Sequence, residues 1–199
     1  MKINPRAVVA MLAALPGSSL AHVGQHDGAG FGAGFLHPLM GLDHLLAMLC
    51  VGAISMCLLP LPRVRLKPAF LLPTAFLAAM LLGGLAGASG ISLPAVESMI
   101  ATSVLLGGLV LLAGRGLPTS AAIGVTALFA FFHGHAHGAE MPADSSALAF
   151  VSGFLLATAL IHVAGIVFAV GCRRLPRGEW LLRLSGAGVL AAGASIAFI

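Results

Sequence analysis

Long apolar stretches separated by short polar segments set the pattern of this chain from residue 36 to its end. Each stretch has the ~20 residues that an α-helix needs to cross the hydrocarbon core of a bilayer. The apolar positions are continuous and do not alternate with polar ones, which argues against the strands of a membrane β-barrel. The pattern predicts an all-α membrane protein, a bundle of six transmembrane helices. We expect the spans at 36–58, 68–88, 93–113, 118–138, 146–171 and 179–198.

The first segment, residues 1–21, has the three regions of a secretory signal peptide. Lys2 and Arg6 supply its positively charged region. An apolar core at residues 7–15 is too short to cross a bilayer, and small residues precede a cleavage site after Ala21. We therefore predict a signal peptide that is removed after Ala21, although the same residues could remain as an uncleaved anchor.

Cleavage there would leave a periplasmic, His-containing tail at residues 22–34, ahead of a six-helix transmembrane domain at residues 35–199. The tail would begin with His22, whose free α-amine and imidazole could chelate a metal ion with help from His26. The alternative is a disordered tail that contributes nothing to function.

The charges of the chain are few, and most of the basic residues lie in the segments between the spans. Hydrophobic residues make up 59% of the chain and charged residues only 8%, whereas soluble domains have about 25% charged residues. Among the loops between the spans, only alternate ones contain basic residues. This positive-inside distribution predicts a periplasmic mature N-terminus and a multi-pass protein of the bacterial inner membrane. Their place in short loops does not indicate binding to nucleic acid. The residues are Arg63, Arg65, Lys67, Arg115, Arg173, Arg174 and Arg177.

Small residues within the spans are placed for close packing between membrane helices. Two of them are four residues apart in the second span, and others lie in the third and sixth spans. We expect helix backbones to approach each other there. The glycines are Gly83, Gly87, Gly107, Gly108 and Gly186.

The first span contains ionisable side chains, which are costly inside a membrane unless they are paired, solvated or bound to something. They are His37, Asp43 and His44, with the thioether of Met48 one turn further on. On a continuous helix His37 and His44 share a face, because positions seven apart differ by only about 20° in direction. Pro38 suits the first turn of such a helix. Asp43 points about 100° away from His44, so a site that uses both needs a disturbed helix or help from another span.

A second polar group stands at the periplasmic end of the fourth span. It consists of His133, His135, His137 and Glu140. If the helix continues, His133, His137 and Glu140 face one way, because their spacing follows the turns of the helix. Imidazole and carboxylate suit Ni, Co, Cu or Zn, although an ordinary interfacial histidine cluster would have the same sequence. His162, well inside the fifth span, is a third position.

Together these side chains form a series of metal ligands that leads from the periplasmic surface into the membrane, as a cation path requires. Two other functions could use the same residues. An intramembrane hydrolase could hold Zn²⁺ on histidine and aspartate and activate water, and paired histidines could ligate haem. The sequence shows no nucleotide-binding loop. We favour a permease, which is not an enzyme and has no bound cofactor.

Three blocks of the sequence are similar to those of a known family. The block from His37 to Met48, H-P-x-x-G-x-D-H-x-x-x-M, resembles the signature of the HupE/UreJ family of nickel permeases, and residues 131–140 and 153–166 resemble its other two blocks. The resemblance implies secondary uptake of Ni²⁺ or Co²⁺ for the maturation of hydrogenase or urease. It does not settle the oligomeric state, or whether a metallochaperone receives the ion on the cytoplasmic side. It implies functional roles for His37, Asp43, His44, His133, His135 and His162.

Overall fold

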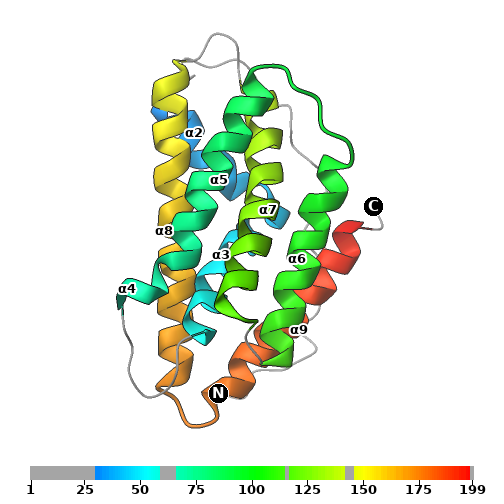
Figure 1. Ribbon diagram of the computed structural model, residues 1–199. Helices are drawn as coiled ribbons and strands as arrows, with labels where there is room; N and C mark the ends of the chain where they lie inside the picture. Colours follow the sequence, from blue (N-terminus) through cyan, green and yellow to red (C-terminus); the bar gives the residue numbers. More distant parts are fainter. Residues whose placement is uncertain (1–29, 59–65, 115–116, 142–145, 198–199) are drawn as a thin grey trace.

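The computed structural model describes residues 30–58, 66–114, 117–141 and 146–197, and every regular element within these ranges is a helix. The predicted all-α class is therefore confirmed for this part of the chain. The signal peptide, and His22 and His26 of the tail, lie outside the described residues. Figure 1 shows a single bundle. Its helices are α2 (Phe31–Met40), α3 (Leu42–Cys57), α4 (Leu66–Ala69), α5 (Leu71–Ala88), α6 (Val96–Ala113), α7 (Thr119–Ala139), α8 (Ala147–Arg173) and α9 (Gly178–Ala197).

Four of these helices, α5, α6, α8 and α9, are long and apolar enough to cross a membrane. The pair α2 and α3 passes the same test as one broken span, bent by 86°. α7 has 21 residues, but three histidines occupy its last two turns and it is not among these candidates. The described residues thus hold four candidate spans, or five if the bent pair is one.

The first predicted span is not a continuous helix. It starts at Phe31, inside the predicted tail, and it breaks at Gly41, which has extended backbone angles (φ −93°, ψ 115°). Pro38 lies inside α2 and not in a first turn as predicted. A proline there has no N–H to donate to the carbonyl oxygen of Gly34, which weakens the helix just before the break.

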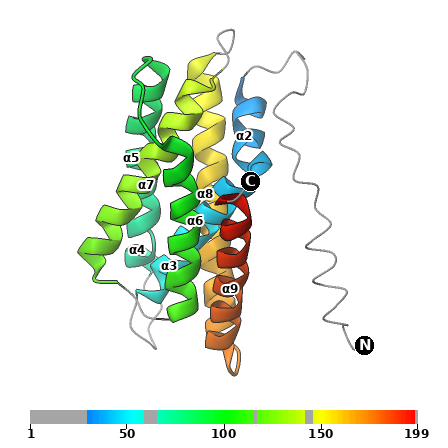
Figure 2. The ribbon, with the colours of Figure 1, turned by 90° about the vertical axis from the view of Figure 1, so that its right-hand side faces the viewer.

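The helices pack in pairs around the bent one. α5 packs along α7, α6 packs along α9, and α8 packs along both α2 and α3. Figures 1 and 2 show α2 in the upper half of the bundle and α3 in the lower half. The break between them therefore lies within the bundle, where its polar side chains meet the other helices.

The contact between α5 and α7 depends on glycines of both helices. A methyl group at Gly83 of α5 would overlap the carbonyl oxygen of Phe131, and one at Gly134 of α7 would overlap that of Met80. Such close backbone approach is the packing that small residues allow between membrane helices. The prediction of close packing is confirmed, and it fixes the place of α7. The other predicted glycines also lie against neighbouring helices: Gly87, Gly107, Gly108 and Gly186.

The lower end of the bundle in Figure 1 is basic. α3, α6 and α8 end there, and α8 ends at Arg173, with Arg174 and Arg177 just after it. Arg173 donates a hydrogen bond to the carbonyl oxygen of Met56, near the C-terminus of α3. Along its sides the bundle exposes large apolar side chains such as Leu148, as expected for a surface that faces lipid.

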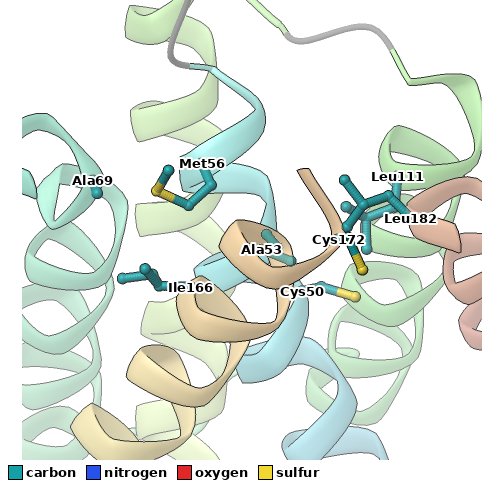
Figure 3. Close-up of a cluster of buried hydrophobic side chains, with 9 residues drawn as sticks. Cys50, Ala53, Met56, Ala69, Leu111, Ile166, Cys172 and Leu182 are labelled. Carbon is teal, nitrogen blue, oxygen red and sulfur yellow. The ribbon is translucent and has the colours of Figure 1, made fainter. Parts of the chain in front are cut away.

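A cluster of buried apolar side chains fills the interior toward this basic end (Figure 3). It joins α3, α6, α8 and α9 through residues that include Met56, Ile166 and Leu182. These side chains are at least nine-tenths buried. A polar path that entered from the other end of the bundle would stop at this cluster.

Candidate metal centre

Asp43 and His44 stand in the first turn of α3, at the break after Gly41. Asp43 Oδ1 lies 2.8 Å from the backbone nitrogen of His44 and 2.8 Å from His44 Nδ1. Both nitrogens donate to the carboxylate, so the neutral His44 ring carries its proton on Nδ1 and keeps a lone pair on Nε2. The N-terminus of a helix also favours a negative charge. The break therefore stabilises the Asp43 carboxylate and orients His44 as a ligand.

The residues His37, His137 and Glu140 form an outer group at the end of α7. His37 comes from α2 and does not share a helix face with His44, because the 86° bend separates them. His37 Nε2 lies 2.8 Å from His137 Nδ1 and 3.6 Å from Glu140 Oε2. One donor atom from each residue of the outer group lies within 4.8 Å of the other two, a spacing that could hold a metal ion.

The outer group reaches the surface through its carboxylate. The Glu140 side chain is 62% exposed and that of His37 is 31% exposed. The nearby imidazole of His37 holds the pKa of the Glu140 carboxyl below its usual value, so Glu140 is an anion at neutral pH. An approaching cation would meet this negative charge first.

The residues His44, His133 and His137 form an inner group. The ring centroids of His44 and His133 are 4.9 Å apart, and those of His44 and His137 are 4.3 Å apart. His133 is fully buried, and its Nδ1 donates to the carbonyl oxygen of Phe129 at 2.9 Å, which leaves the lone pair on Nε2. Within the described part of the chain, the Nε2 atoms of all three rings are buried without a hydrogen-bond partner. Leaving such atoms unbonded is costly, and each of them is free to bind a metal ion. Among the described residues, only the outer group has its three ligand atoms within 4.8 Å of one another, so the inner group is a cluster of free ligands and not a formed three-ligand site.

Aromatic side chains of α8 enclose the histidines. The rings of Phe150 and Phe154 contact His37, and Phe154 also contacts His137. These apolar rings make the surroundings of the histidines less polar, which strengthens the attraction between a cation and its ligands. They were not predicted from the sequence. Two phenylalanines four residues apart at the outer end of the fifth span are the signal that could have found them.

Three predicted ligands lie away from both groups. His135 is about 200° around α7 from His133 and His137, and its Nε2 donates to the carbonyl oxygen of Ile91 at 2.6 Å. Met48 is fully buried in an apolar cluster with Phe76. His162 lies on α8, where its ring contacts Phe76. The residues that the structure brings together are His37, Asp43, His44, His133, His137 and Glu140.

Comparison with known proteins gives one family and one relative. A family model described as HupE / UreJ protein matches residues 9–196 of the chain. The chain is 40% identical over 196 residues to Protein HupE of Rhizobium leguminosarum bv. viciae, and the match covers 98% of both chains. No solved structure is similar at a significant level.

Proposed function

Because the chain belongs to the HupE/UreJ family of membrane transporters, which is associated with nickel and cobalt uptake for hydrogenase or urease, we propose that it is a secondary permease for Ni²⁺ or Co²⁺. It would act in the bacterial inner membrane and supply the maturation of one of these enzymes. The observation that carries the proposal is the inner group, in which three buried histidine Nε2 atoms have no partner among the described residues. Imidazole nitrogen is a ligand that suits both ions.

Six spans would form the permease. Four helices and the bent pair, counted as one span, would supply five of them, and α7 would be the sixth, with its buried histidines inside the bundle. The end that carries Arg173, Arg174 and Arg177 would face the cytoplasm. Glu140 would then face the periplasm, on the same side as the mature N-terminus that follows the signal peptide.

The ion would pass from the outer group to the inner group through His137, which belongs to both. His137 contacts the rings of both His37 and His44. It could therefore hold the ion while His44 replaces His37, so that the ion is never without a protein ligand. Transport needs successive sites of this kind, each weak enough to release the ion to the next.

The broken first span supports a transporter. In secondary transporters, discontinuous helices bring helix ends and polar groups to a substrate site inside the membrane. Here the break brings the N-terminus of α3, with Asp43 and His44, beside the histidines of α7.

The test is uptake of radioactive Ni²⁺ by bacterial cells that lack their own nickel uptake system and express this protein. We expect these cells to accumulate much more Ni²⁺ than cells with an empty vector. Co²⁺ should inhibit the Ni²⁺ uptake more strongly than Mg²⁺ does. If the protein is present in the membrane and neither Ni²⁺ nor Co²⁺ accumulates, the proposal is wrong.

The substitution Gly41→Ala should lower uptake several-fold without unfolding the protein. A methyl group at Gly41 would lie 3.0 Å from both Asp43 Oδ1 and His44 Nδ1, so this hydrogen-bonded pair would have to shift. The backbone angles of Gly41 are ones that alanine adopts. The matched control is Gly32→Ala in α2, where the added methyl group would have no atom of another described element within 4 Å. Equal uptake by the two variants would contradict the role of the Asp43–His44 pair.

A further inference from the structure

Two buried polar side chains of α8, Thr158 and His162, are not used by the outer and inner groups. They are one turn apart on the same side of the helix, and 0% and 1% of their surfaces are exposed. Thr158 Oγ1 and both ring nitrogens of His162 have no hydrogen-bond partner in the described ranges. A threonine within a helix commonly bonds the carbonyl oxygen of the preceding turn, as Thr102 of α6 does with Ser98. Thr158 does not, so its hydroxyl is free for a ligand.

These two side chains lie deeper in the bundle than the inner group. His133 is six residues from the outer end of α7, or roughly 9 Å along the helix. His162 is fifteen residues from the outer end of α8, or roughly 22 Å. On the other side of His162, one turn further along α8, Ile166 belongs to the apolar cluster that fills the basic end of the bundle (Figure 3). Thr158 and His162 are therefore followed by an apolar seal.

The ring of Phe76 connects the two levels. Its centroid is 5.8 Å from that of His133 and 4.9 Å from that of His162. Phe76 also lines a cavity of about 60 Å³ whose other lining residues include Cys50, Ser103 and Thr126. The ring thus contacts both histidines and has free space beside it.

We propose that Thr158 Oγ1 and a ring nitrogen of His162 form a second, deeper metal station for the transported divalent cation, separated from the inner group by the Phe76 ring. This inference rests on the proposed function. The station offers two protein ligands, a neutral imidazole nitrogen and a hydroxyl oxygen, and water that travels with the ion would complete the coordination. Two ligands bind an ion weakly. Weak binding is needed at a site that must release the ion toward the cytoplasm.

The variants Thr158→Val and Thr158→Ser test the station, because valine has the shape of threonine without the hydroxyl and serine keeps the hydroxyl. Radioactive Ni²⁺ uptake by cells and Ni²⁺ binding by the purified protein in detergent are both measured. We expect Thr158→Val to lower uptake about tenfold, the loss typical of an impaired metal site, and Thr158→Ser to stay within about twofold of wild type. The affinity of the outer and inner groups for Ni²⁺ should be unchanged in both variants.

His162→Leu should lower uptake at least as much as Thr158→Val and also keep binding at the outer and inner groups. If it does not fold, Thr158→Val decides alone, because this change leaves the packing volume unchanged. If Thr158→Val takes up Ni²⁺ at the wild-type level, the proposed metal station is wrong. The buried polar atoms of Thr158 and His162 then hold only a structural water. Wild-type protein that transports neither Ni²⁺ nor Co²⁺ overturns the proposed function instead, so the two failures are distinct.

Discussion

Asp43→Asn should lower nickel uptake by about tenfold to a hundredfold while the protein still folds and enters the membrane. The carboxylate accepts hydrogen bonds from the backbone nitrogen and from Nδ1 of His44. An amide in its place loses the negative charge and can present its NH₂ group to His44 Nδ1, which would reverse the ring's proton arrangement. Loss of such a supporting carboxylate typically lowers metal affinity or activity by this amount. Radioactive Ni²⁺ uptake, corrected for the amount of protein in the membrane, measures the effect.

A matched control for this variant is Ser55→Ala in the same helix. Ser55 is buried and donates its hydroxyl to the carbonyl oxygen of Gly52, one turn before it. Its loss removes a polar group from α3 without touching a histidine, so uptake should remain near the wild-type level. If the Asp43→Asn variant takes up Ni²⁺ at the wild-type level, the Asp43–His44 pair is not part of the path.

Gly134→Ala should destabilise the protein strongly. The added methyl group would overlap the backbone carbonyl of Met80, which cannot move aside as a flexible side chain can. Overpacking of this kind costs about 1–3 kcal/mol, and α7 would have to move away from α5 with its histidines. We expect a lower melting temperature of the purified protein in detergent and a loss of Ni²⁺ uptake.

Gly124→Ala is the comparison for this change, because it adds the same methyl group to the same helix. No atom lies within 4 Å of that group at Gly124, and alanine favours the helix over glycine by about 1 kcal/mol. This variant should melt at or above the wild-type temperature. If the two variants have the same melting temperature, the close contact between α5 and α7 does not determine the stability of the fold.

The sequence was sufficient to predict the parts of the molecule that follow from helix periodicity. Continuous apolar stretches predicted the all-helical class, and the spacing of the α7 residues predicted that His133, His137 and Glu140 would face one way. The same periodicity places His135 on the other side of α7, where the Ile91 carbonyl accepts its hydrogen bond. The shared spacing, and not the number of histidines in the segment, is therefore the informative signal.

The break in the first span could not be predicted from local sequence. Pro38 is compatible with a first turn as well as with the position inside α2 that it occupies. Gly41 allows an extended backbone but does not require one. The choice depends on the contacts that the bend creates, above all those of His37 and His44 with His137, which is about a hundred residues away. Contacts between distant residues leave no periodic signal in the chain.

The most direct test of the account is Ni²⁺ uptake by lipid vesicles that contain only the purified protein, compared with vesicles that contain His133→Gln. His133 is fully buried at the innermost position of the inner group, so its loss does not change the capture of ions at the surface. The account predicts that wild-type vesicles accumulate Ni²⁺ and that His133→Gln vesicles do so at least about tenfold more slowly. Two results would contradict it. Vesicles with wild-type protein could take up Ni²⁺ no faster than empty vesicles, or the two proteins could take it up equally fast.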